Sequence, residues 1–178
     1  MEILAIDEGL NLRLINEKDA ESYITLVYEN SEILKAEGYN FHFLLGKMLT
    51  DYCWAYAEGV AKLNKEGDYY NYLLYQANSP QPIGNIYVYN IQHRLSTCEI
   101  AFLIDDDFTK QGLATRMLQK VVKFCVEQIK IQAVFASILP DNLIARKILE
   151  KSGFKKESQS VQAFEGAFRA IDYYVVRV

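Results

Sequence analysis

The sequence has few of the residues that build metal and disulfide sites. It contains two histidines, and its three cysteines, Cys53, Cys98 and Cys125, lie far apart with no C-x-x-C pair. A three-histidine metal site is therefore excluded by number, and neither a zinc ribbon nor a disulfide framework is indicated. The composition still allows a carboxylate cage, but we expect no metal cofactor.

Long apolar runs and an excess of basic residues are also lacking. No run of about 18 apolar residues occurs, and residues 1–7 carry no basic lead, so neither a membrane span nor a signal peptide is expected. There are 19 Lys and Arg against 23 Asp and Glu, which gives a formal net charge of −4. This acidic balance argues against a nucleic-acid partner and favours a cationic ligand. We expect a cytoplasmic protein.

What is present is an ordinary globular composition, with 178 residues of which 51% are hydrophobic. This length predicts a single domain over residues 1–178. Hydrophobic periodicity predicts strands over 10–14, 69–76, 83–92, 97–104, 133–138, 154–160 and 169–177, and helices over 19–30, 113–129 and 142–152. Hairpins that lead into a strand-helix-strand-helix unit indicate the α/β class, with a mixed, mostly antiparallel sheet and flanking helices.

Residues 31–63 form an unusually aromatic segment that we expect to be helical but interrupted. The expected breaks are Gly38, Gly46 and Gly59, and the aromatic residues are Tyr39, Phe41, Phe43, Tyr52, Trp54 and Tyr56. Two interpretations stay open: a lid packed on the core, which we favour, and one wall of an acceptor pocket.

The loop over residues 105–116 joins a strand directly to a long helix and contains one glycine, Gly112. A helix start presents unpaired backbone N–H groups and the positive end of the helix dipole. Small side chains at Gly112 and Ala114 would let a diphosphate approach those amides. Neither G-x-x-x-x-G-K-[ST] nor G-x-G-x-x-G occurs. The alternative is a helix start that needs a small residue for packing, and the three aspartates at 105–107 count against an anion site.

The helix that follows this loop is amphipathic. Its apolar residues Ala114, Met117, Leu118, Val121 and Cys125 share one face and are expected to form a core stripe. Cys125 is therefore interpreted as a packing residue and not as a nucleophile.

The compact helix over 142–152 carries polar residues on one side. Asp141 or Asn142 is expected to cap it, Gly153 to end it, and Arg146 to share a face with Asn142. That face would meet a nucleotide at the neighbouring helix start, if both helices flank adjacent parallel strands. A capping Asn with a solvated Arg is the alternative. Asp172 is expected to be a structural anchor and not an acceptor contact.

Together these two segments resemble the GNAT acetyltransferases. The family's Q/R-x-x-G-x-G/A loop falls on residues 109–114, with Thr109 at its first position, and N-x-x-A/S…K-x-G-F falls on residues 142–154. Residues 12–15, 19–20, 29–32 and 98–103 also look like the RimJ/RimL branch, which acetylates the N-termini of ribosomal proteins. The resemblance spans nearly the whole chain.

The resemblance implies acetyl-CoA as co-substrate. Its pyrophosphate would bind the backbone amides of Gln111, Gly112, Leu113, Ala114 and Thr115. Its pantetheine would run along Phe102, Leu103 and Ile104, between two parallel strands that splay apart. Asn142 would approach the pantetheine arm, and Arg146 would approach the adenosine side.

Acetyl transfer needs an unprotonated amine, so a base or a water relay is expected. Period-two alternation over 97–104 places Glu99 on the face opposite Cys98, beside the proposed acyl site. Glu99 is interpreted as a general base, acting directly or through water, or as a structural partner of a nearby Arg or Tyr. A backbone N–H near Leu103 is a candidate oxyanion donor. Many family members place a Tyr where this chain has Leu149, so Ser137 or water is left to protonate the thiolate.

These observations favour an N-acetyltransferase that acts on a primary amine by direct attack in a ternary complex. A peptide or protein N-terminal α-amine is the leading acceptor, although the same fold serves many amines. A polyamine or another small amine suits the acidic balance. A non-catalytic acyl-CoA-binding module is the third interpretation, because of Thr109 and the missing Tyr. Relatives in this branch often pair through aromatic segments, so a homodimer is compatible with the sequence.

Overall fold

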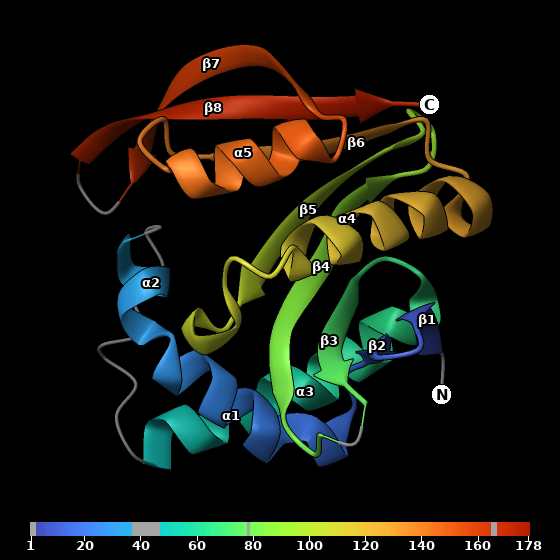
Figure 1. The fold of residues 1–178 in the computed structure, drawn as a ribbon, viewed down its shortest axis with the longest axis vertical. Coiled ribbons are helices and arrows are strands. Elements are labelled where there is room, and N and C mark those ends of the chain that lie inside the picture. The colour runs from blue at the N-terminus through green and yellow to red at the C-terminus, as the bar shows by residue number, and fades with distance from the viewer. Residues whose placement is uncertain (1–2, 37–46, 78, 165–166) are drawn as a thin grey trace.

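The computed structural model describes residues 3–36, 47–77, 79–164 and 167–178. Within them, eight strands form one sheet in the order β1-β2-β3-β4-β5-β6-β8-β7 (Figure 1). The strands are β1 (Ile3–Asp7), β2 (Leu10–Leu14), β3 (Tyr70–Gln76), β4 (Pro82–Gln92), β5 (Thr97–Ile104), β6 (Ala133–Ile138), β7 (Lys155–Phe164) and β8 (Ala167–Arg177). Described neighbours pair antiparallel except β5 and β6, which are parallel. The expected mixed, mostly antiparallel α/β sheet is confirmed.

Helices cover both faces of this sheet. They are α1 (Ala20–Glu29), α2 (Ser31–Ala36), α3 (Lys47–Glu66), α4 (Leu113–Phe124) and α5 (Leu143–Lys151), with short 3-10 turns η1 (Glu17–Asp19) and η2 (Asp106–Phe108). Helix α4 continues as one π-helical turn over Cys125–Ile129. Helices α4 and α5 pack on one face, and α1 and α3 pack on the other.

The core follows from the alternation of side chains along the strands. On the α4 face, the strand residues Leu12, Tyr72, Leu74, Ile86, Ile100 and Val134 pack with the helix stripe Met117, Leu118, Val121 and Cys125. On the opposite face, Leu73, Tyr75 and Leu103 pack with Tyr23, Leu26 and Val27 of α1 and with Ala57 and Val60 of α3. The core stripe predicted for the long helix is therefore confirmed, with Cys125 fully buried.

The parallel pair at the centre of the sheet separates before its strands end. Pairing between β5 and β6 runs from Thr97–Ala133 to Ile100–Ala136 and goes no further. Beyond this last rung, residues 101–104 of β5 stay paired with β4, and residues 137–138 of β6 stay paired with β8. The two strands therefore splay apart toward their C-terminal ends, as Figure 1 shows.

Two features of the N-terminal half differ from the sequence-based expectation. Strand β1 was not predicted, although it pairs with β2 along the sheet edge. The expected break at Gly59 is wrong, since α3 runs through it. A helix tolerates such a glycine at about 1 kcal/mol, and burial of the neighbouring Ala57 and Val60 offsets this cost. The expectations for Gly38, Gly46, Tyr39, Phe41 and Phe43 lie outside the described residues.

Candidate active site

The loop that follows β5 is tied to the end of α1 by a buried side chain. Asn30 is 2% exposed, its Oδ1 accepts from the Asp106 amide at 3.1 Å, and its Nδ2 donates to the Leu26 carbonyl at 2.9 Å. Asp105 caps η2, because its carboxylate accepts from the Asp107 amide at 3.0 Å. These bonds fix the start of the loop relative to α1, and they turn the first aspartate of the acidic run into a structural cap.

The rest of this loop leads to the start of α4, where backbone N–H groups face free space. Lys110 and Gly112 have φ angles of +62° and +73°, in the left-handed region. A Cβ placed on Gly112 would meet no atom within 4 Å, so space lies above the backbone here. The Arg116 amide donates to the Gly112 carbonyl at 3.2 Å, so the N–H groups before Arg116 precede the helical hydrogen-bond ladder. Unpaired donors, a positive dipole end and free space fit a diphosphate.

The charged side chains near the start of α4 are either exposed or paired with other residues. Asp106 and Asp107 are exposed. Arg116 pairs with Asp7 of β1 at 2.6 Å. The Gly9 amide and the Arg116 guanidinium lower the pKa of Asp7 below its usual value. Arg116 therefore ties α4 to the first strand.

Past the last β5–β6 rung, β5 offers a strand edge beside α4. Phe102 and Ile104 pack toward the α4 face, and Leu103 is buried on the other face. Their backbone pairs with β4 on one side only. An extended ligand that carries amide groups can add to such an edge by main-chain hydrogen bonds.

Glu99 and Ser137 lie on either side of the last rung. Glu99 pairs with Phe135 one rung before it, and Ser137 follows Ala136 directly. Both side chains lie on the sheet face opposite α4, since Cys98 and Ala136 point into the α4 core. Ser137 is exposed. The structure thus brings the two predicted catalytic residues to one face, on the two strands that separate.

Tyrosines from α1, α3 and β4, together with Tyr69 just before β3, gather on this face. The rings of Tyr23 and Tyr56 stack at 5.1 Å, Tyr23 shares a hydrogen bond with Tyr87 at 2.9 Å, and Tyr56 shares one with Tyr69 at 3.1 Å. Burial raises the pKa of Tyr23 and of Tyr56, so both stay neutral. Tyr87 sits opposite Ala101, the first β5 residue past the last rung. Tyr56 is thus packed on the core, as the favoured interpretation of the aromatic segment expects.

The caps predicted for α5 are confirmed. The Asn142 side-chain oxygen accepts from the Ala145 amide at 2.9 Å, which is an N-cap bond. Gly153, with a φ of +90°, follows the helix. Asn142 therefore stands at the start of α5.

Arg146 makes contacts that neither of its interpretations included. Its Nη2 donates to the Pro140 carbonyl at 2.7 Å and lies 3.7 Å from the Asp172 carboxylate. Asp172 is fully buried and also binds Lys156 and Gln159, both at 2.6 Å. Burial raises the pKa of Asp172, but these hydrogen bonds and the two positive charges outweigh it, so the pKa is lowered overall. This arrangement agrees with the anchoring role expected for Asp172.

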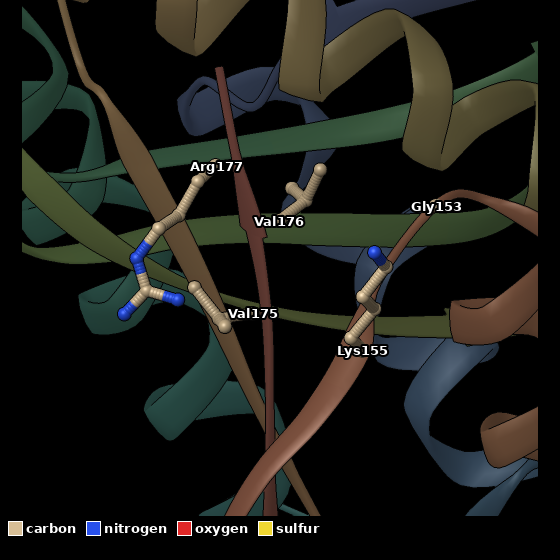
Figure 2. A pocket seen from close by; sticks show the side chains of 5 residues that line it. All are labelled: Gly153, Lys155, Val175, Val176 and Arg177. Carbon is tan, nitrogen blue, oxygen red and sulfur yellow. The ribbon is translucent and has the colours of Figure 1, made fainter.

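A hollow of about 380 Å³ lies at the far end of the sheet, lined by Gly153, Lys155, Val175, Val176 and Arg177 (Figure 2). Arg177 is paired with Glu157 and lies over the Phe135 ring. The hollow contains none of the residues predicted for catalysis or for CoA. In the part of the chain that the structure describes, no helix is long and apolar enough to cross a membrane, and no three His, Cys, Asp or Glu side chains gather as for a metal ion.

A sheet whose central parallel strands splay apart beside an open helix start defines an acyltransferase-type α/β fold. The chain matches the acetyltransferase (GNAT) domain model over residues 9–155 and belongs to this family. It is an N-acetyltransferase, so the resemblance found in the sequence is confirmed. Among curated proteins, it is 26% identical over 153 residues to the probable N-acetyltransferase YjcK of Bacillus subtilis (strain 168), covering 82% of this chain and 80% of YjcK.

Solved structures agree with this fold over nearly the whole chain. RimL, a ribosomal L7/L12 alpha-N-protein acetyltransferase in complex with coenzyme A, has a TM-score of 0.90 and 18% identity, covering 99% of this chain and 98% of that one. MccE, a microcin C7 self immunity acetyltransferase in complex with acetyl-CoA and AMP, has a TM-score of 0.87 and 15% identity, covering 97% and 94%. At these identities the matches establish the fold.

Proposed function

We propose that this N-acetyltransferase uses acetyl-CoA to acetylate the N-terminal α-amine of a peptide or protein. The observation that carries the proposal is the end of β5–β6 pairing at Ile100–Ala136, with Glu99 on one face and the start of α4 beyond the other. A thioester held at this opening would be reached from the Glu99 face by an amine.

The proposed binding site for CoA is formed by backbone groups near the point where β5 and β6 separate. The pyrophosphate would bind the amides of residues 111–115, over the space above Gly112. The pantetheine would add to the free edge of residues 102–104. Asn142 and Arg146, at the start of α5, would approach the pantetheine arm and the adenosine side. Acetyl-CoA supplies the activated acyl group of the thioester.

The side chains on the open face would handle the protons. Glu99 takes a proton from the ammonium of the acceptor, directly or through a water, and so frees the amine that attacks. The amine nitrogen then forms its bond to the acyl carbon, and the bond from that carbon to sulfur breaks. The backbone N–H near Leu103 polarises the carbonyl oxygen. Ser137, or water, gives a proton to the departing thiolate and takes up the second proton, which the nitrogen loses as it becomes an amide.

A peptide acceptor is favoured because the face that carries Ser137 is open. Among the described residues, the apolar cluster under α1 and α3 takes no residue from β6 or β8. An extended chain can therefore approach over these strands. The similarity in fold to RimL, whose substrate is a protein α-amine, supports the same class of acceptor.

The experiment measures thiol release from acetyl-CoA with a panel of amines. Peptides with a free N-terminus should give a kcat/KM at least about tenfold above that of a polyamine, a margin within reach of pocket contacts. The matched control is each peptide with its N-terminus blocked, which should give no turnover. Faster turnover of the polyamine would contradict the proposed acceptor. Thermal stabilisation by acetyl-CoA without turnover of any amine would favour the binding module instead.

A further inference from the structure

The hairpin of β4 and β5 contains a bulge next to Glu99. Tyr89 pairs with Glu99 and Gln92 pairs with Thr97, so two residues of β4 stand against one residue of β5. This count defines a β-bulge, a feature that re-aims side chains beside active sites. Asn90 is the first of the two β4 residues in this bulge.

Asn90 adopts a backbone conformation that L residues rarely take. Its φ is +49°, in the left-handed region where such bulges normally place glycine. Asparagine tolerates this region better than most residues. An asparagine here therefore carries conformational strain that a glycine would not. The contact that its side chain makes gives a reason for its presence.

The Asn90 side chain holds the carboxylate of Glu99. Its Nδ2 donates to Glu99 Oε1 at 2.6 Å, and its Oδ1 accepts from Gln92 Nε2 at 3.0 Å. Among the residues that the structure describes, this amide is the one hydrogen-bond partner of the Glu99 side chain. The groups facing Glu99 from adjacent strands are Tyr89 and Phe135.

We infer that Asn90 is a positioning residue that, through the β4 bulge, fixes the conformation of the Glu99 carboxylate from the side of the hairpin turn. The inference rests on the proposed role of Glu99 as the base. The contact leaves Oε2 for the amine or its water, and Gln92 fixes which end of the Asn90 amide faces Glu99. The Arg177 guanidinium lies over the Phe135 ring, 6.0 Å from its centroid, and is paired with Glu157.

The test uses two variants that keep the bulge. Asn90→Gly retains the positive φ and removes the amide, so kcat should fall about tenfold, the size of one hydrogen bond to a charged group, with the KM for acetyl-CoA unchanged. Asn90→Asp puts a second carboxylate beside Glu99, which disfavours the ionised form. The acidic limb of the kcat/KM profile should move up by about one pH unit.

Two controls distinguish a positioning role of Asn90 from a merely structural role, and from the case in which Glu99 is not the base. Ser96→Gly changes another positive-φ residue of the same hairpin, with a φ of +52°, and should leave kcat and the pH profile unchanged. In a Glu99→Gln background, Asn90→Gly should cause no further loss. An equal loss in both backgrounds, or unchanged pH profiles, would overturn the role of Asn90. Full activity of Glu99→Gln would instead overturn Glu99 as the base, and the inference with it.

Discussion

At the residue scale, Gly112 combines a left-handed backbone with open space above it. Gly112→Asp should weaken CoA binding at least about tenfold, because a side chain and a negative charge would enter the space proposed for the pyrophosphate. Isothermal titration with CoA gives the Kd. Gly112→Asn is the matched control, since it has the same size and tolerates positive φ but carries no charge. Unaltered affinity in Gly112→Asp would refute the placement of the pyrophosphate at this loop.

Single residues also mark the limit of sequence reasoning about the site. Glu99 and Gly112 were predicted because a strand period and a loop motif fix their places. Asn90 was missed, because a bulge depends on pairing between strands and leaves no local pattern. The one sequence signal is the residue type, since asparagine tolerates positive φ and Asn90 lies close to the expected hairpin turn. The ion pair between Arg146 and Asp172 was missed because it joins residues of α5 and β8, which sequence spacing does not relate.

At the element scale, α5 presents an N-cap residue that is also the proposed contact of the pantetheine arm. Asn142→Ala should lower the free energy of unfolding by about 1 kcal/mol, since the Ala145 amide loses its acceptor. Asn142→Asp keeps an acceptor for that amide, so stability should be retained while CoA affinity falls through loss of the side-chain N–H donor. Urea unfolding and CoA titration of both variants separate the two roles. Equal CoA affinity in wild type and Asn142→Asp would show that this residue only caps the helix.

The bounds of elements with strong hydrophobic periodicity were predicted closely. Strands that depend on pairing with a neighbouring strand were missed or predicted too short. The strand over 97–104 and the helical region over 113–129 have the predicted bounds. Strand β1 escaped prediction because it is short and lies at the sheet edge, where three of its five residues are exposed. Strand β7 runs to Phe164, beyond the predicted 154–160, because pairing with β8 supports a polar segment that lacks alternation.

At the scale of the whole molecule, the two parts of the sheet that meet at the splay share one core on the face of α4 and α5 and differ on the other face. In the described residues, the cluster under α1 and α3 includes Leu73 and Tyr75 of β3 and Leu103 of β5, and none from β6, β7 or β8. Strands β6, β8 and β7 carry α5 (Figure 1). The sequence predicted the order of these elements, but the point where β5 and β6 separate was implied by family resemblance alone. The anchor of the second part is Asp172, which joins β8 to β7 through Lys156 and to α5 through Arg146.

This anchor predicts how stability depends on pH. The pKa of Asp172 is lowered in the folded state, so its contribution is present above the unfolded-state pKa of about 3.9 and is lost as pH falls through the folded value. At pH 7, Asp172→Asn should lower the free energy of unfolding by about 1 to 2 kcal/mol. The loss is kept small because Lys156 and Arg146 are partly exposed and solvent screens their charges. Urea unfolding at a series of pH values should show this difference shrinking below about pH 4, where wild type also loses the charge. Asp106→Asn, which changes an exposed aspartate, should match wild type throughout. A difference for Asp172→Asn that stays constant into acid would mean that the residue acts through packing and not through its charge.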